Sequence, residues 1–395
     1  MKKILLLGGS PQQVPAIQYA KSEGYFTILC DFLSDNPGQK FADKFYLEST
    51  TDKEKILEIS INEKIDGIVA YASDPAAATA AYVSEKLSLP TNPYKSVKTL
   101  SNKGLFRNFL QDNSFNTPKC NTASVLEEID VDNYMYPLIV KPTDSSGSKG
   151  ISKVYSSENL ESAFNFAKEN SREGTVIVEE FIEKDHEFLV GGDIFILDGE
   201  IKFLGLLNCH RDFKVNHLVP VGKSYPVFLK KNRIVKIEEE LKRIANLLEL
   251  EFGGFNIELI FDKNDNLYFI EIGPRSGGNM IPELLSMVSN VDMMKLLVDI
   301  SMGKKIGKLK FEENKYFATH NIHTNQDGIF DNLEIDSKLS KYIVKEKLYV
   351  SKGDRIEYFS SANKALGIIF MKFEDEETMY RVLSELENHI IIEMR

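Results

Sequence analysis

Two glutamates lie in neighbouring apolar segments, at a spacing that could support metal chemistry. Glu258 alternates with apolar residues in Phe255–Ile260, and Glu271 does so in Tyr268–Ile272. A short turn at 263–266 joins the segments, so antiparallel pairing can bring both carboxylates together. Adjacent carboxylates repel each other unless a cation joins them. Oxygen ligands of this kind suit Mg²⁺, which keeps several waters and takes phosphate oxygens as its remaining ligands.

Arg275 follows the second segment and begins a turn of small residues. Its guanidinium would stand next to the metal, where it could hold a carboxylate or a developing phosphoryl charge. The turn Ser276–Asn279 leads into a helix expected to begin near Pro282, and backbone N–H groups at such a place favour an anion. Asn256 shares a strand face with Glu258.

A glycine loop follows another apolar strand. The strand Pro137–Pro142 carries Lys141 near its end, and Ile151–Tyr155 is expected to be a returning strand. The small residues of the intervening segment 143–150 let backbone N–H groups approach an anion closely. The pattern indicates a phosphate clamp between antiparallel strands, distinct from a P-loop. A surface hairpin with an ordinary lysine is the alternative interpretation.

A third strand, Val176–Phe181, runs into an acidic and then apolar segment. Its backbone could meet the edge of an adenine, and Phe181 or Ile182 could cover the ring. Glu187 could accept hydrogen bonds from ribose hydroxyls. Exposed glutamates after a strand are common, so this segment indicates a nucleotide only in combination with the other two.

The elements that must position these residues begin with a βαβα pattern over the first ninety residues. Continuous apolar runs that end in glycine or aspartate predict strands buried on both faces of a parallel sheet. Parallel sheets bind ligands beyond the carboxyl ends of their strands, where Gly9, Ser10 and Asp74 fall. The expected strands are Lys3–Leu7, Phe26–Asp31 and Gly67–Tyr71, and the expected helices are Pro11–Gly24, 51–62 and Asp74–Leu87.

A breaker cluster at 89–93 predicts a boundary after this first part. The later elements are expected to be a helix at 97–111, strands at 187–196 and 200–207, a helix at 232–248 and a hairpin over 254–262 and 266–272. The last eighty residues mix strand and helix without a recognisable motif. They could complete the preceding part or cap the site.

The composition argues against several other functions. The formal net charge is −11 and the pI is near 5.3, which leaves no basic footprint for nucleic acid or an anionic membrane. Three widely separated cysteines form no disulfide framework and favour a reducing compartment. No segment approaches the roughly 20 apolar residues of a membrane helix, so a cytoplasmic protein is expected. The segment Gly222–Ser224 imitates the end of a P-loop but lacks the glycine five residues earlier.

In this order and spacing, the three elements resemble the ATP-grasp superfamily, in particular its carbamoyl-phosphate-synthase-like and amino-acid-ligase-like members. The resemblance implies an α/β fold, with α+β character in the catalytic part. It implies an N-terminal Rossmann-like domain with a parallel sheet, a small lid and a large antiparallel-sheet catalytic part. The implied boundaries are 1–92 for the first domain, 93–118 for a linking helical segment, 119–183 for the lid and 184–395 for the catalytic part with its C-terminal α/β extension.

The resemblance also assigns the nucleotide site by position. Lys103 and Lys141 would hold the α- and β-phosphates of ATP. The loop residues that would close over the β- and γ-phosphates are Ser145, Ser146, Gly147, Ser148 and Gly150. The residues that would hold adenine are Glu179, Glu180, Phe181 and Ile182, with Glu187 on the ribose.

Metal, catalytic and substrate roles follow in the same way. Glu258 and Glu271 would bind Mg²⁺, with Mn²⁺ able to substitute. Many members carry an asparagine where this chain has Gly273, so the two glutamates and water would coordinate the metal, or Asn279 or Asn256 would take its place. The number of Mg²⁺ ions stays open. Arg275 would steady an acyl phosphate, and Lys141 and Ser276 complete the catalytic candidates. The substrate candidates are Gly9, Ser10, Asp74, His210, Arg211, Gly277, Gly278 and Asn279.

The implied function is an ADP-forming carboxylate–amine ligase. Amino acids, with dipeptide-type products, are the first expected substrate class, and a sugar or nucleotide-precursor substrate is the alternative. Three alternatives stay open: a bicarbonate-activating or carbamoyl-phosphate-type enzyme, an ATP-binding module without turnover, and a dehydrogenase that uses the first domain. The expected partners are a small carboxylate and an amine, with no nucleic acid and no membrane. The resemblance also implies a homodimer, although the sequence shows no interface.

Overall fold

A four-stranded parallel sheet opens the chain, in the order β3-β2-β1-β4. The computed structural model describes the backbone of residues 1–395 and all side chains except those of 216–218. The predicted parallel sheet is confirmed, and β3 is an edge strand that was not predicted. Its strands are β1 (Lys3–Leu7), β2 (Phe26–Asp31), β3 (Lys44–Leu47) and β4 (Gly67–Val69).

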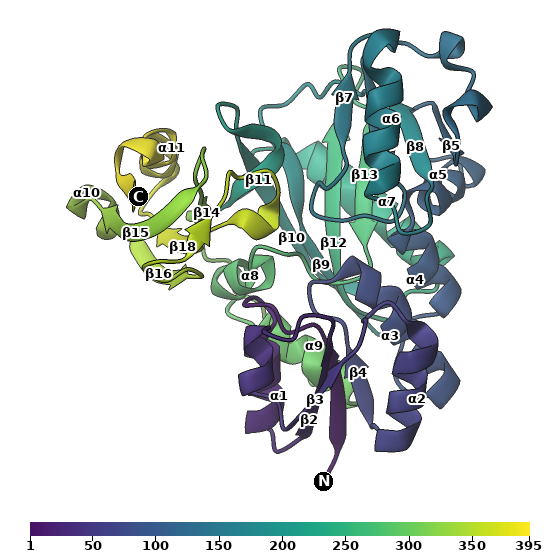
Figure 1. Cartoon of the computed structure of the whole chain (residues 1–395), viewed down its shortest axis with the longest axis vertical. Helices are drawn as coiled ribbons and strands as arrows, with labels where there is room; N and C mark the ends of the chain where they lie inside the picture. Colours follow the sequence, from purple (N-terminus) through teal and green to yellow (C-terminus); the bar gives the residue numbers. More distant parts are fainter.

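Helices cover this sheet, and one of them comes from a distant part of the chain. The local helices are α1 (Val14–Ser22), α2 (Lys53–Glu63) and α3 (Asp74–Leu87). Helix α9 (Met293–Ser301) packs with α1 and β4, and its Val298 is fully buried in one core with Ile4 and Ile17. Figure 1 shows α9 beside the strands that begin the chain. Helix α9 belongs to the segment predicted as the catalytic part, yet it packs on the first sheet. The predicted domain boundaries therefore remain predictions.

Two helices, α4 (Tyr94–Ser101) and α5 (Lys103–Asp112), replace the single helix predicted at 97–111. Asn102 separates them because its backbone is extended and its side chain accepts a hydrogen bond from Leu105 N at 3.1 Å. This is an N-cap. The break places Lys103 at the first residue of α5, with its backbone N–H donating to Thr143 O at 2.8 Å.

The predicted lid strands form a four-stranded antiparallel sheet in the order β5-β8-β6-β7. The glycine loop joins β6 to β7, so the prediction of antiparallel strands on either side of it is confirmed. Helix α6 buries its apolar face on this sheet. The elements are β5 (Cys120–Ala123), β6 (Leu138–Pro142), β7 (Ser152–Val154), α6 (Leu160–Glu169) and β8 (Val176–Glu180).

An eight-stranded antiparallel sheet, in the order β13-β12-β9-β10-β11-β14-β18-β16, forms the centre of the molecule (Figure 1). One face packs on α7 and the other on α8 and α9, which gives two separate apolar cores. The strands are β9 (Leu189–Leu197), β10 (Glu200–Asp212), β11 (Asn216–Tyr225), β12 (Phe252–Phe261), β13 (Leu267–Gly273), β14 (Phe317–Ile322), β16 (Ile343–Leu348) and β18 (Gly367–Lys372). The helices are α7 (Lys231–Leu247) and α8 (Ile281–Ser289).

The C-terminal segment both extends this sheet and adds a small layer. Three of its strands, β14, β16 and β18, belong to the eight-stranded sheet, so the segment continues that sheet. A further three-stranded sheet has the order β17-β15-β19. The remaining elements are β15 (Gly328–Ile335), α10 (Ser337–Ser340), β17 (Arg355–Ile356), α11 (Glu376–Ser384) and β19 (Ile390–Met394). Among the described residues, no helix has the length and apolar character needed to cross a bilayer.

Candidate active site

A cavity of about 420 Å³ lies where the first layer, the lid, the large sheet and the C-terminal segment meet. Most of the predicted site residues line it, although they come from widely separated parts of the sequence. The C-terminal segment contributes Tyr349 and Asn363, so it also borders the site. The remaining lining residues that matter below are Ser10, Gln12, Asp74, Lys103, Lys141, Ser145, Ser146, Gly147, Ser148, Lys149, Lys223, Asn256, Glu258, Glu271, Arg275, Gly278 and Asn279.

A buried ion cluster joins the lid to the helix before it. The Lys141 ammonium lies 2.6 Å from one oxygen of Glu179, and Arg107 Nε lies 2.7 Å from the other. Arg107 also donates to the carbonyls of Phe269 and Ile270 on β13, at 3.1 and 2.8 Å. Burial raises the pKa of Glu179, but the charges of Arg107 and Lys141 outweigh it and lower that pKa to about 2. Burial lowers the pKa of Lys141 against the attraction of Glu179.

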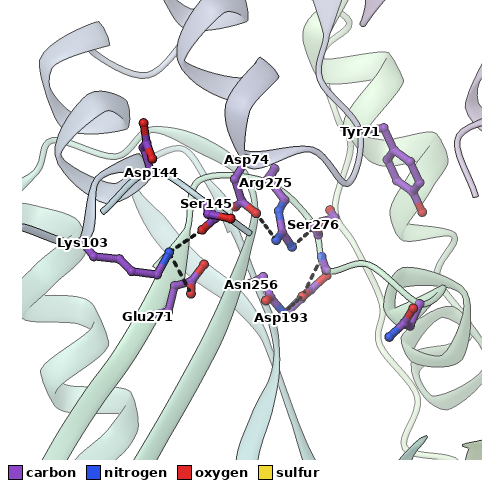
Figure 2. A network of polar contacts seen from close by, with 12 residues as sticks. Tyr71, Asp74, Lys103, Asp144, Ser145, Asp193, Asn256, Glu271, Arg275 and Ser276 are labelled. Carbon is purple, nitrogen blue, oxygen red and sulfur yellow. Dashed lines mark hydrogen bonds and ion pairs between the residues drawn. The ribbon is translucent and has the colours of Figure 1, made fainter. Parts of the chain in front are cut away.

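The glycine loop is anchored at its base and open at its tip. The Lys103 ammonium donates to Ser145 O at 2.5 Å and lies 3.8 Å from Glu271 Oε2. Asp144 accepts from the backbone N–H groups of Arg172 and Glu173 at 2.9 and 2.8 Å. At the tip, a Cβ on Gly147 would meet nothing within 4 Å. Figure 2 shows Lys103 between the loop and the large sheet.

Glu258 and Glu271 lie directly opposite each other on β12 and β13, as the hairpin pattern predicted. The Glu258 carboxylate has no hydrogen-bond or ion-pair partner among the described side chains. The Glu271 carboxylate forms one long ion pair, with the Lys103 ammonium 3.8 Å away. Paired carboxylates with so few partners fit a divalent cation. The described part of the chain contains no cluster of three or more His, Cys, Asp or Glu, so the other ligands would be water and phosphate oxygens. The side-chain nitrogen of Asn256 donates to Gly192 O and Asp193 Oδ1. The side-chain oxygen of Asn256 is therefore the atom that could bind a metal.

Asp193, on β9, holds the turn that follows Arg275. Both of its carboxylate oxygens accept from Gly277 N, at 2.8 and 3.0 Å, and one accepts from Asn256 at 3.0 Å. Burial raises the pKa of Asp193. A Cβ on Gly277 would lie 2.7 Å from Ile281 Cδ1 and 2.8 Å from Asn256 Nδ2 and Asp193 Oδ1, so a larger residue would displace these side chains. The turn is therefore fixed by a buried acid (Figure 2).

Arg275 bridges the large sheet and the first layer by an ion pair with Asp74. Its guanidinium also donates to Ser276 O at 3.0 Å (Figure 2). Three buried polar atoms in this region lack partners in the described part of the chain: Arg275 Nε, Asp74 Oδ1 and Ser10 Oγ. Unsatisfied buried groups are rare, and here they border one cavity, so they indicate a polar ligand.

The structure brings some further predicted residues to this cavity and leaves others outside it. Asn279 lines it and its N–H donates to Gln12 Oε1 at 3.0 Å, whereas the buried Ser276 lies against Gly254. Gly9 is absent from the lining because it packs beneath Asn36, and its N–H donates to the buried Asp31.

The predicted adenine and ribose residues lie beyond the lining residues, along β8 and the segment after it. Glu180 accepts from Met135 N at 3.0 Å. The Phe181 ring is partly exposed, with the Lys153 ammonium 3.4 Å from its centroid. The Glu179 side chain is occupied by the ion cluster, so any contact of this segment with adenine falls to its backbone and to its neighbours Phe181 and Ile182.

His210 and Arg211 do not join Arg275, contrary to the predicted grouping. They line a second cavity of about 580 Å³, together with His320 and His323. Side chains alternate along β10, and His210 pairs with Gly222 next to the Cys209–Lys223 pair, so His210 lies on the opposite face of the sheet from Lys223, which lines the first cavity. Burial lowers the pKa of His210 to about 4 and that of His320 to about 3.

Three residues of the site were not predicted from the sequence: Arg107, Asp193 and Lys223. Arg107 is fully buried in a helix, and Asp193 follows two glycines within an apolar strand. A buried charge within an apolar run is the one signal that could have identified them, because such charges are almost never left unpaired. Lys223 lay in the segment set aside as a false P-loop.

Comparison with known proteins finds a matching family model and several similar chains. Residues 100–279 match the family model described as the ATP-grasp domain. The chain is 26% identical over 333 residues to the carbamoyl phosphate synthase large chain of Thermotoga petrophila, covering 80% of this chain but 30% of that one. It is 27% identical over 383 residues to the formate-dependent phosphoribosylglycinamide formyltransferase of Methanocaldococcus jannaschii, covering 92% and 93%.

Solved structures agree on the fold. The L-amino acid ligase of Bacillus licheniformis has a TM-score of 0.82 at 18% identity, covering 100% of this chain and 99% of that one. The phosphoribosylglycinamide synthetase of Anaerococcus prevotii has a TM-score of 0.78 at 23% identity, covering 100% of each chain. The fold is therefore the one shared by these enzymes.

Proposed function

We propose, from the match of residues 100–279 to the ATP-grasp domain, that the protein is an ADP-forming ligase that joins a carboxylate to an amine. A carboxylate oxygen attacks the γ-phosphorus of ATP, the bond to ADP breaks, and an acyl phosphate forms. The amine then attacks the acyl carbon, loses a proton and expels phosphate. The observation that carries the proposal is one cavity that combines lysines, facing carboxylates and an arginine. Phosphoryl transfer asks mainly for positioning and charge neutralisation, which these groups supply.

The nucleotide would lie between the lid and the large sheet. Lys103 and Lys141 are proposed to hold the α- and β-phosphates, with the loop of Ser145–Gly150 over the outer phosphates. The buried Glu179 fixes Lys141 in place. The backbone of the following segment is proposed to meet adenine, and Glu187 the ribose. Closure of the loop would exclude water, which matters because an acyl phosphate hydrolyses.

Glu258 and Glu271 are proposed to hold Mg²⁺, with Asn256 Oδ1 as a further ligand and Mn²⁺ able to substitute. The cation would supply charge neutralisation to the phosphate oxygens. The relatives support a nucleotide–metal site in general, since one structural neighbour was solved with MgADP.

The acyl phosphate is proposed to form beside Arg275, near the turn of Gly277 and Gly278. Asp74 and Ser10 face the same place from the first layer and are proposed to contact the amine or carboxylate partner. The relatives' names include an L-amino acid ligase and a formate-dependent formyltransferase, so a small carboxylate is the proposed substrate class. Asn279 completes the proposed site, whereas the buried Ser276 lies outside the cavity lining.

The test is the release of ADP and phosphate from MgATP by the purified protein. Pools of amino acids and other carboxylates are offered with and without amines. Release that needs both a carboxylate and an amine supports the proposal. Release with bicarbonate alone would replace it by bicarbonate activation. Tight ATP binding without release in any pool would contradict a ligase and indicate a nucleotide-binding module.

A further inference from the structure

A third buried lysine, Lys223, faces the cavity without an ion-paired carboxylate. It is 4% exposed and lines the cavity from the middle of the large sheet. Its ammonium donates to Cys209 Sγ at 2.6 Å, and among the described side chains no carboxylate forms an ion pair with it. The other buried cations of the cavity differ, because Lys141 is paired with Glu179 and Arg275 with Asp74.

The sheet places Lys223 close to the metal-binding face. Strand register pairs Lys223 with Cys209, and Gly191 with Glu258. A Cβ on Gly191 would lie 3.0 Å from Lys223 Nζ and 2.6 Å from Cys209 Sγ. The absence of a side chain at Gly191 thus leaves the space in which the Lys223 ammonium lies. Gly191 is on β9, which pairs directly with the strand that carries Glu258.

The thiol does not supply the missing charge. Burial raises the pKa of Cys209, and this outweighs the opposing effect of Lys223, so the thiol is protonated near neutral pH. Burial raises the pKa of Asp193 and the charge of Lys223 opposes that rise, but the two groups form no ion pair. A buried ammonium without a paired anion is costly. A ligand anion that enters the cavity would remove that cost, which makes the lysine a preformed anion subsite.

We propose that Lys223 binds the reacting anion: first the carboxylate of the substrate, then the phosphate released from the acyl phosphate. The inference rests on the proposed ligase function and adds to it a substrate-binding residue. The ammonium would hold the carboxylate against repulsion from the γ-phosphate, while Cys209 accepts one of its hydrogens and fixes its direction. Lys103 and Lys141 then bind the nucleotide phosphates, and Lys223 binds the carboxylate that reacts with them.

The test uses inorganic phosphate as the probe, titrated calorimetrically into the full-length protein saturated with MgADP. Lys223→Met removes the ammonium and keeps a similar length. Lys202→Met is the matched control, because Lys202 is an exposed lysine on neighbouring β10, paired with Glu200. Lys223→Met should bind phosphate at least about tenfold more weakly than wild type, as expected for loss of a charge-assisted contact, with MgADP affinity unchanged. Lys202→Met should match wild type.

Equal phosphate binding by wild type and Lys223→Met, including none in both, would overturn the inference. Failure of every protein to bind MgADP would instead overturn the proposed function, so the two failures are distinct. If Lys223→Met does not fold, reductive methylation of wild type gives the answer. Phosphate added to the MgADP complex should suppress methylation of Lys223 but not of Lys202, as read by peptide mass spectrometry. Unchanged methylation of Lys223 would contradict the proposal.

Discussion

At the scale of single residues, the site depends on a few buried charges whose partners come from other elements. Glu179 is the clearest case, since its carboxylate is enclosed by Arg107 and Lys141. Removing one partner of such a cluster leaves an uncompensated buried charge, which typically costs about 3–5 kcal/mol. The cluster therefore fixes Lys141 rigidly, but protonation of Glu179 should lower the stability of the lid.

We predict that Glu179 contributes stability that is lost in acid. Its pKa is about 2 in the folded protein, below the ordinary value of 4.5, so its contribution is complete above about 4.5 and disappears as the pH falls towards 2. Urea unfolding at a series of pH values measures this loss. Glu179→Gln should be less stable at neutral pH and should lack this part of the acid dependence. An identical pH profile for both proteins would contradict the assignment.

A second residue-scale prediction concerns the facing carboxylates. Glu271→Gln should raise the Mg²⁺ concentration for half-maximal ADP release at least about tenfold. Loss of a residue that only hydrogen-bonds to a metal ligand already lowers metal affinity about 10- to 100-fold, and loss of a ligand itself should cost no less. Glu239→Gln, at an exposed position of α7, is the matched control. Wild-type Mg²⁺ dependence in Glu271→Gln would show that the cation lies elsewhere.

At the scale of elements, hydrogen bonds between β9 and the turn after β13 set the geometry of the catalytic end. Asp193 holds Gly277 and Asn256 at once, so the turn depends on a strand more than eighty residues away in sequence. A larger residue at position 277 would displace those same two side chains. A change in Asp193 should therefore act on the turn and not on the nucleotide.

We predict that Asp193→Asn lowers turnover by about ten- to hundredfold, since it weakens charge-assisted hydrogen bonds that aim the turn. The KM for ATP should stay near that of wild type. Asp262→Asn is the control, because Asp262 holds the opposite turn of the β12–β13 hairpin through Asn264 N and Asn266 N. Steady-state kinetics of the three proteins decide the matter, and a raised KM for ATP without loss of turnover would count against the assignment.

The same elements show how far the sequence alone could lead. Strands β1 and β2 and helix α3 have the predicted bounds, because their apolar runs and capping residues are local signals. Glu258 and Glu271 were predicted to meet because a short turn leaves the hairpin little choice of register. Strand β11 was missed, since proline, glycine and lysine interrupt it. Its Lys223 and the distant Asp193 reach the site through strand pairings that no local pattern encodes.

At the scale of the whole molecule, the cavity exists because separate layers are held against one another. Arg275 and Asp74 join the large sheet to the first layer, and Lys347 on β16 donates to Pro11 O at 2.7 Å. Helix α9 packs on the first sheet, with Val298 buried in the shared core. The first layer thus depends on residues far along the chain, which neither composition nor periodicity could predict.

We predict that Gly67→Ala weakens this junction. A Cβ at Gly67 would lie 2.4 Å from Ser301 O, so β4 and α9 would have to separate. Overpacking of this kind costs about 1–3 kcal/mol, measured by urea unfolding. Gly307→Ala is the control, since its Cβ would meet nothing within 4 Å. Equal stability of the two variants would contradict the close packing of α9.

The central claim is that a carboxylate is activated as an acyl phosphate, and oxygen isotopes test it most directly. The carboxylate identified by the release assay is labelled with ¹⁸O and converted with MgATP and the amine, and the released phosphate is analysed by mass spectrometry. The mechanism predicts one ¹⁸O atom in each phosphate, because the bridging oxygen leaves with phosphorus when the amine attacks carbon. Phosphate without ¹⁸O would show that water, not the carboxylate, receives the phosphoryl group.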